Sequence, residues 1–330
     1  MVHSFKSNNL KILSYYEAIQ VFFNYERNDK KMIPPIISYV TFNRLGLTVK
    51  SLTSLLGTTD DFELHIIDNK STDGTWQFIQ SLNDSRIKTR THIDINAGLI
   101  YSLNINLSKR RPEQYFITLD NDVCIETEDW ISKFMKVFEK FPEVGLLGVE
   151  KAIIYPKRLP PIIHKKTNGI AYIEIENEFP DVENNSVPGN IICLRPELLN
   201  EIGYFSEENC FGTTELCYRV NNHTNYKTGF VSNIKIKMPQ EIECINCQYA
   251  NKCILDKETE TCISKYNKLN KNNEFMDKFK WKLDETIIDL QSGARPVYSA
   301  SANDGNSTSN NIFNMEWAMD NFDFFIKNAN

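Results

Sequence analysis

Residues 115–123 read Tyr-Phe-Ile-Thr-Leu-Asp-Asn-Asp-Val, an apolar run that ends in two carboxylates separated by one residue. The run predicts a buried strand, so Asp120 and Asp122 are expected where that strand leaves its sheet. Open α/β sheets bind their ligands beyond the carboxyl ends of their strands. Two carboxylates this close repel each other, and Mg2+ or Mn2+ would relieve the repulsion. We therefore expect a divalent metal site here, with a solvated turn as the alternative.

Length and composition favour one large domain with appendages. The chain has 330 residues, of which 41% are hydrophobic, and a net charge of −6. This charge argues against nucleic acid or an anionic membrane as a partner. No run reaches the ~18 apolar residues of a membrane span, and the first nine residues lack the apolar core of a signal peptide. We therefore expect a cytoplasmic protein without a transmembrane segment, whose cysteines are thiols or metal ligands.

Strand-like and helix-like patterns alternate from residue 34 onward. Strands are expected at 36–40, 62–67, 86–90 and in the run before Asp120, with a helix in each interval. Asp73 is expected to cap the helix that begins at Thr75. This order predicts an α/β fold with a mostly parallel central sheet and flanking helices. The polar loops that follow the strands should gather on one edge of that sheet.

Four motifs of this region follow one another in order. They are Val-Thr-Phe-Asn-Arg at 40–44, Asp-Asn-Lys-Ser-Thr-Asp-Gly-Thr at 68–75, Asn-Ala-Gly at 96–98 with Asn104, and Asp-Asn-Asp at 120–122. In this combination the chain resembles the GT-A glycosyltransferases of the family 2 type, which use nucleotide-sugar donors. The resemblance covers residues 34 to 125 and extends more weakly to residue 231. It implies a Rossmann-like GT-A fold and inverting transfer, dependent on Mn2+ or Mg2+, from a donor such as a UDP-sugar to a hydroxyl of a glycan or glycoconjugate.

The resemblance also implies which residues line the nucleotide-sugar pocket. They are Thr41, Asn43, Arg44, Asp68, Asn96, Gly98, Asp120, Asn121 and Gly189, with Asp120 and Asp122 holding the metal. A carboxylate such as Asp68 can accept hydrogen bonds from a base or a ribose, and Arg44 offers a bidentate donor fork. The alternatives are a local capping network for Asp68, a surface ion pair for Arg44 and a simple turn at Gly98.

The second half of the family pattern is incomplete. Residues 215–219, Glu-Leu-Cys-Tyr-Arg, resemble the end of the family's acidic helix. Registered on Arg219, the chain has Gly212, Thr213 and Glu215 where the family usually has three acids. Thr213 takes the place of the usual base, and a hydroxyl cannot act as a general base at neutral pH. Glu215 is therefore the candidate catalytic base, with an ion pair to Arg219 as the alternative.

The missing acids support a second hypothesis, from a different functional class. The chain could be a sugar-nucleotide- or glycan-binding protein that keeps the GT-A fold and has lost its catalytic base.

Four cysteines lie close together beyond the resemblance, in a polar stretch where burial does not explain them. They are Cys244, Cys247, Cys253 and Cys262. Zinc takes four thiolates tetrahedrally and can fix a short chain that has no core of its own, so a structural zinc site is the leading interpretation. An iron–sulfur cluster is the second interpretation, and disulfides or unpaired thiols are the third.

These features divide the chain into four parts. We expect a helical segment at 1–33, a GT-A domain at 34–239, a four-cysteine module at 240–270 and a C-terminal region at 271–330. In the last part, apolar spacing over 272–290 predicts a helix, and the Ser-, Asn- and Gly-rich stretch 291–311 predicts a flexible segment. The aromatic residues after 313 predict a segment that docks on this protein or supports self-association.

Overall fold

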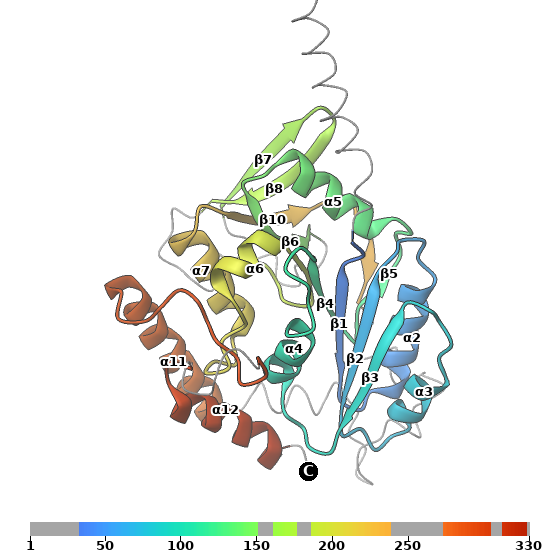
Figure 1. Ribbon diagram of the computed structural model, residues 1–330, viewed down its shortest axis with the longest axis horizontal. Coiled ribbons are helices and arrows are strands. Elements are labelled where there is room, and N and C mark those ends of the chain that lie inside the picture. Colours follow the sequence, from blue (N-terminus) through green and yellow to red (C-terminus); the bar gives the residue numbers. More distant parts are fainter. Residues whose placement is uncertain (1–32, 151–160, 177–185, 239–272, 305–311, 329–330) are drawn as a thin grey trace, which may run out of the picture. The chain divides into compact units, whose positions relative to one another are not determined.

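The computed structural model describes residues 33–150, 161–176, 186–238, 273–304 and 312–328 (Figure 1). Internal contacts separate residues 1–34 from a unit formed by residues 35–330, and that second unit is described below. The predicted N-terminal helix and the four cysteines between 244 and 262 lie outside the described residues. None of the helices in the described part combines the length and the apolar character of a membrane span.

The first half of the unit is built from parallel strands. β1 (Ile36–Thr41), β2 (Glu63–Asn69), β3 (Ile87–Ile93) and β4 (Phe116–Asp120) lie in the order β3-β2-β1-β4, with every neighbouring pair parallel. The connecting helices are α2 (Leu45–Leu56), α3 (Thr75–Ser81) and α4 (Leu99–Leu107). The chain moves outward from β1 to β3 and then returns to place β4 on the other side of β1. This change of direction is a topological switch point, and ligands bind at its carboxyl edge in open α/β sheets.

The second half changes the sheet from parallel to mixed. It contains β5 (Cys124–Ile125), α5 (Trp130–Lys140), β6 (Val144–Val149), β7 (Ile162–Thr167), β8 (Ile170–Ile175), β9 (Ile191–Leu194), α6 (Pro196–Ile202), α7 (Gly212–His223), β10 (Lys227–Val231) and β11 (Ile236–Lys237). Within the described residues, nine strands form one sheet in the order β3-β2-β1-β4-β9-β6-β10-β8-β7, and β11 pairs with β5 separately.

The prediction of a mostly parallel sheet is correct for β1 to β4, whereas in the remainder of the described sheet only β6 and β10 pair in parallel. β9 runs antiparallel to both β4 and β6, and β8 runs antiparallel to both β10 and β7. The order of strands along the chain does not reveal that β9 inserts between β4 and β6, because that insertion is decided by pairing between distant segments. The fold class is therefore α/β with a large mixed sheet.

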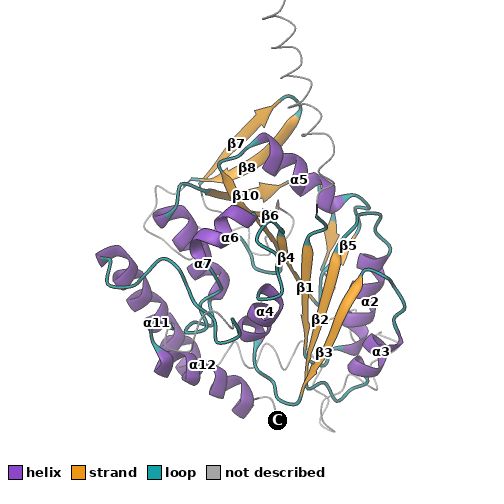
Figure 2. Cartoon of the chain, in the orientation of Figure 1, coloured by secondary structure: helices purple, strands orange, loops and turns teal. Residues whose placement is uncertain are grey.

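Two hydrophobic cores hold helices on opposite faces of this sheet. One core joins α2, α3 and α5 to the sheet through residues such as Leu52, Ile79 and Trp130. The other joins α4, α6 and α7 through residues such as Leu103, Leu198 and Leu216. Figure 2 shows α2 and α3 on the side of β1–β3 opposite to α4. Both layers are needed because strands of this kind are apolar on both faces.

His65, in the middle of β2, gives the fold a pH dependence that can be tested. Burial, assisted by the charge of Lys109, lowers the pKa of His65 to about 4. Between pH ~6.5 and ~4 the unfolded chain binds a proton that the folded chain does not, so the free energy of unfolding should fall by roughly 2 kcal/mol over this range. The His65→Gln variant keeps a hydrogen-bonding group near Thr89 and should lose this part of the slope in chemical unfolding. Equal slopes for the wild type and the variant between pH 7 and pH 4 would contradict the assignment.

The C-terminal region is packed more tightly than its composition predicts. α11 (Asn273–Ser292) confirms the predicted helix, and the aromatic segment forms α12 (Met315–Asn328), which docks on this unit. The prediction of a flexible stretch is wrong for residues 295–304. Ser299 N donates to Ile202 O and Ser299 O accepts from Tyr204 N, both at 2.9 Å. Ser301 is fully buried and donates to Glu207, so the polar side chain that suggested flexibility is satisfied inside the fold. Self-association stays a prediction.

Candidate functional site

The ends of β1 and β4 are joined by polar contacts at the switch point. Asp120 ends β4, and Asn121 Nδ2 donates to Thr41 Oγ1 of β1 at 2.9 Å. Arg44 Nη1 lies 2.9 Å from Asn121 Oδ1 and 3.3 Å from Asp122 Oδ2. The structure therefore brings these five residues together at the carboxyl edge of the sheet. Arg44 forms an ion pair, which the sequence left open as the alternative to a role in donor binding.

The carboxylate pair has the electrostatics of a cation site. Burial, followed by the neighbouring charge of Asp122, raises the pKa of Asp120 to about 7, and Arg44 only partly opposes the rise. A divalent cation would remove the repulsion and use both groups as ligands. Among the described residues, no three acidic, histidine or cysteine side chains converge on one point. A cation held here would therefore need further oxygen ligands from a substrate or from water.

The carboxyl end of β2 holds the buried carboxylate of Asp68, one of whose oxygens is unpaired within the described part of the chain. Asp68 Oδ1 accepts from Ser71 N at 2.9 Å and lies 2.8 Å from His92 Nδ1. Asp68 Oδ2 is buried and has no hydrogen-bond partner among the described residues. The local network considered as an alternative is thus present, but it uses only one of the two oxygens. An unpaired buried acceptor is costly, and a ligand N–H would satisfy it.

Hydrogen bonds join the loop after β1 to the loop after β2. Asn43 N donates to Ser71 Oγ at 2.6 Å, and Thr72 N donates to Asn43 Oδ1 at 2.8 Å. Asn43 and Arg44 both have positive φ values, 53° and 65°. A pair of non-glycine residues in the left-handed region is strained and persists only where the surroundings fix it. The two loops together provide that constraint.

Asp73 has a wider role than the predicted cap. Gly74, with φ 93°, occupies the N-cap position of α3. Asp73 Oδ2 accepts from Leu45 N at 2.9 Å, and Asp73 Oδ1 accepts from Thr75 N at 3.1 Å. One carboxylate therefore bridges the first residues of α2 and α3, which positions both loops at the sheet edge.

Gly98 lies close to the site, and the ring of Phe325 occupies the space where a side chain at position 98 would be. The Asn96 side chain accepts from Gly98 N at 3.0 Å, and Gly98 O accepts from Asn69 Nδ2 at 3.3 Å. A Cβ built on Gly98 would lie only 2.5 Å from the ring of Phe325 in α12. The resemblance implied a close approach of the sugar nucleotide to this loop, and on the Cβ side of Gly98 the structure places Phe325.

Gly189 and Asn190 connect the end of β4 with Thr213 of α7. Asp120 N donates to Asn190 O at 2.9 Å, which fixes residues 189–190 next to the end of β4. A Cβ on Gly189 would lie 2.3 Å from Thr213 Oγ1, so the Thr213 hydroxyl packs directly on the glycine. Thr213, which the resemblance puts at the position of the base, therefore lies near the end of β4 and carries a hydroxyl.

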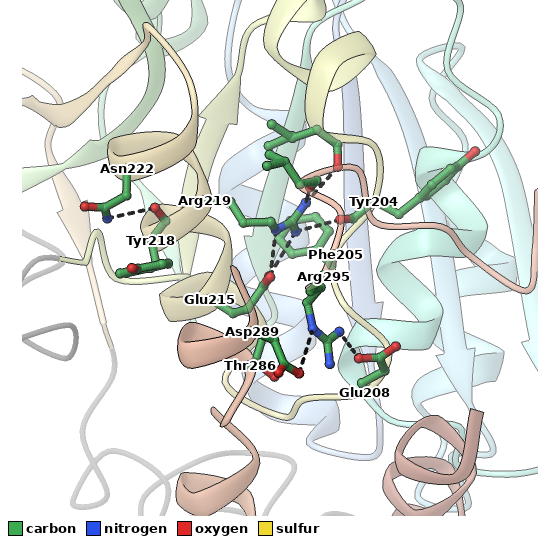
Figure 3. Close-up of polar contacts among 12 residues, drawn as sticks. Tyr204, Phe205, Glu208, Glu215, Tyr218, Arg219, Asn222, Thr286, Asp289 and Arg295 are labelled. Atoms are coloured by element: carbon green, nitrogen blue, oxygen red, sulfur yellow. Dashed lines mark hydrogen bonds and ion pairs between the residues drawn. The ribbon is translucent and has the colours of Figure 1, made fainter. Parts of the chain in front are cut away.

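Glu215 forms a buried ion pair, as Figure 3 shows. It is 1% exposed, and its two oxygens lie 2.7 Å and 2.9 Å from Nε and Nη2 of Arg219. Arg219 also donates to the carbonyls of Ile202 and Tyr204. A carboxylate enclosed in this way has no open face for an acceptor hydroxyl. The ion pair, which the sequence left open as the alternative, explains Glu215 better than the role of catalytic base.

Sequence reasoning gave no role to three residues of this edge. Asn69 stands inside a recognised motif, and its place directly after Asp68 was a usable signal. No pattern marks His92 as the partner of Asp68, or Phe325 as the partner of Gly98. Both contacts join distant parts of the chain.

Comparison with known proteins finds a family model that is similar to part of this chain. Residues 36–195 match the model described as Glycosyl transferase family 2. The matched region includes β1 to β4 together with Arg44, Asp68, Gly98, Asp120 and Gly189, and it ends before α7. No curated protein matches the chain.

Several solved structures are similar to this chain at low identity. The crystal structure of S. aureus TarS has 18% identity over 67% of this chain and 41% of that chain, with a TM-score of 0.47. The chain thus spans less than half the length of that protein. S. aureus TarS 1–349 in complex with UDP-GlcNAc has 16% identity over 67% of this chain and 69% of that one, with a TM-score of 0.47. The mannosyltransferase PcManGT from Pyrobaculum calidifontis, in complex with GDP-Man and Mn2+, has 14% identity over 97% and 95% of the two chains, with a TM-score of 0.47.

Proposed function

We propose that this protein is a family 2 glycosyltransferase that moves a sugar from a nucleoside-diphosphate donor to a hydroxyl of a glycan or glycoconjugate. The observation that carries the proposal is the pair Asp120 and Asp122, which lies at the switch point of the sheet and inside the region that matches the family. The same edge carries the strained Asn43–Arg44 turn and the buried Asp68, so three loops converge where a donor would bind.

The free oxygen of Asp68 favours a uridine donor. Asp68 Oδ1 is already occupied by Ser71 N and His92, which leaves Oδ2 for a ligand. Uracil offers one ring N–H on the edge that a carboxylate can reach, whereas guanine offers an N–H and an amino group side by side. A single free acceptor oxygen therefore suits uracil better. We accordingly propose a UDP-sugar as donor.

The metal part of the proposal concerns the donor diphosphate. Asp120 and Asp122 would hold Mn2+ or Mg2+, which when bound stabilises negative charge on the leaving diphosphate. Arg44 lies beside the same carboxylates, keeps a positive charge at the site and orients Asn121. Direct attack by the acceptor hydroxyl would invert the anomeric carbon and would need a proton acceptor near the attacking oxygen.

One observation favours the second hypothesis, that of a binding protein with the same fold. Thr213 carries a hydroxyl near the end of β4, and Glu215 is held by Arg219. Neither Thr213 nor Glu215 therefore supplies a free carboxylate that could act as the base. This arrangement would bind a sugar nucleotide and turn it over slowly or not at all.

A turnover assay separates the two hypotheses. The full chain is incubated with Mn2+, a panel of UDP- and GDP-sugars and glycan acceptors, and the released nucleoside diphosphate is quantified. Acceptor-dependent release supports the transferase, whereas donor binding without release supports the binding protein. Thr213→Asp sharpens the result, because a chain that lacks only its base should gain turnover from a carboxylate at this position.

The remaining parts of the proposal follow from the sequence. We place the GT-A domain at residues 34–239. We also place a structural zinc ion on Cys244, Cys247, Cys253 and Cys262, and these four cysteines lie outside the described residues. Stoichiometric zinc in the purified full chain is the expected result of elemental analysis. Iron with acid-labile sulfide, or no metal, would reject this assignment.

A further inference from the structure

α12 brings the end of the chain to the edge of the sheet where the donor is proposed to bind. Figure 1 shows this helix beside the start of α4. Three ring carbons of Phe325 lie within 2.9 Å of the point where a Cβ on Gly98 would be. One helical turn earlier, the ring of Phe322 meets Tyr101 of α4 at a centroid distance of 5.3 Å. α12 therefore packs against both the 96–98 loop and the first turn of α4.

The loop under Phe325 has a conformation that needs support. Gly98 has φ 79° and ψ 172°, a region that is essentially restricted to glycine. Its carbonyl accepts from Asn69 and from Ser102, which fixes it to the end of β2 beside Asp68. The Phe325 ring covers the side of Gly98 where a side chain would be. The loop is thus held by hydrogen bonds from β2 and α4 and by an aromatic contact from α12.

The position of Phe325 is itself fixed by several anchors. Asn321 Nδ2 donates to Glu207 O at 3.0 Å, and Asp320 lies 3.1 Å from Nζ of the buried Lys282 in α11. The rings of Phe324 and Phe279 meet at 6.1 Å. These contacts tie α12 both to α11 and to the loop before α7. α12 is therefore a fixed wall of the site, and a rigid wall can impose a shape on the loop it touches.

We propose that Phe325 is a positioning residue of the donor site, which through Gly98 holds the 96–98 loop in the shape that binds a nucleoside diphosphate. The identity of the ligand rests on the proposed function, whereas the effect on the loop rests on the contact alone. The C-terminal helix, which lies outside the family 2 match, thereby becomes part of the site. Loss of the ring should loosen the loop and weaken nucleotide binding without removing any group that touches the metal.

The test compares Phe325→Ala, the conservative Phe325→Leu and the control Trp317→Ala. Trp317 lies on the same helix and packs on Trp281 of α11, so its loss weakens α12 without removing the ring on Gly98. With Mn2+ present, the Kd for UDP should rise roughly tenfold in Phe325→Ala, return most of the way to the wild-type value in Phe325→Leu and stay within about twofold of it in Trp317→Ala. Hydrogen exchange of the amides of residues 94–104, measured without nucleotide, should accelerate about tenfold in Phe325→Ala only.

The two measurements separate the failure of this inference from the failure of the proposed function. If the wild type binds UDP and Phe325→Ala binds it equally well or more tightly, the positioning role is overturned and the proposed function stands. If the wild type binds neither UDP nor GDP, the proposed function fails, and the donor role of Phe325 fails with it. Unchanged exchange in Phe325→Ala, or equal acceleration in Trp317→Ala, overturns the specific effect of the ring on the loop.

Discussion

Replacing both Asp120 and Asp122 by Asn is expected to abolish metal-dependent nucleotide binding, with a loss of affinity of at least about a hundredfold. The two carboxylates supply the negative charge that attracts a divalent cation at the switch point, and neutral amides do not replace it. The fold should survive, because Asn has nearly the same shape and the change removes a repulsion between neighbouring charges. Calorimetric titration of UDP with Mn2+ measures the binding, and thermal unfolding should show midpoints within a few degrees of each other.

The matched control removes the same number of charges elsewhere. Asp61 and Asp277 are exposed. Asp61→Asn combined with Asp277→Asn should therefore leave metal-dependent binding intact. Undiminished binding by the Asp120→Asn, Asp122→Asn variant would refute the assignment of the metal site. Equal losses in the two double variants would point to net charge rather than to a site.

Arg219→Met is expected to destabilise the protein by about 3–5 kcal/mol. Arg219 is 1% exposed and binds both oxygens of Glu215 as well as the carbonyls of Ile202 and Tyr204. Its removal leaves a buried carboxylate without its partner and takes one donor from each of the carbonyls of Ile202, Tyr204 and Val297. The free energy of unfolding, obtained by urea denaturation, measures this loss.

A double variant tests whether the unpaired charge is the cause. Glu215→Gln combined with Arg219→Met removes the buried charge as well as its partner, and it should be more stable than Arg219→Met alone by at least about 1 kcal/mol. If Arg219→Met unfolds like the wild type but loses turnover, the ion pair has a part in the chemistry and the structural role assigned to it is wrong.

The parallel half of the fold could be predicted because its signals are local. β1, β2 and β4 contain apolar runs, β3 has strand-forming residues between polar ones, polar residues follow each strand, and a helical pattern fills each interval. The same local order placed Arg44, Asp68, Asp120 and Asp122 at one edge, because parallel strands connected by helices end on the same side of a sheet.

The remaining features depend on contacts between distant segments, which periodicity does not encode. Nothing in residues 191–194 indicates that β9 lies antiparallel between β4 and β6. The stretch around Ser301 has the composition of a flexible segment, yet a buried Glu207 satisfies its hydroxyl. The space on the Cβ side of Gly98 is filled by Phe325, and local sequence patterns do not connect these two residues.

The most direct test of the proposed donor site is a calorimetric titration of UDP and GDP into the wild-type full chain, with and without Mn2+. The account predicts that UDP binds when Mn2+ is present, that binding weakens strongly without the metal, and that GDP binds less tightly than UDP. If neither nucleotide binds in the presence of Mn2+, the carboxylate pair at the switch point is not a donor site and the proposed function is wrong.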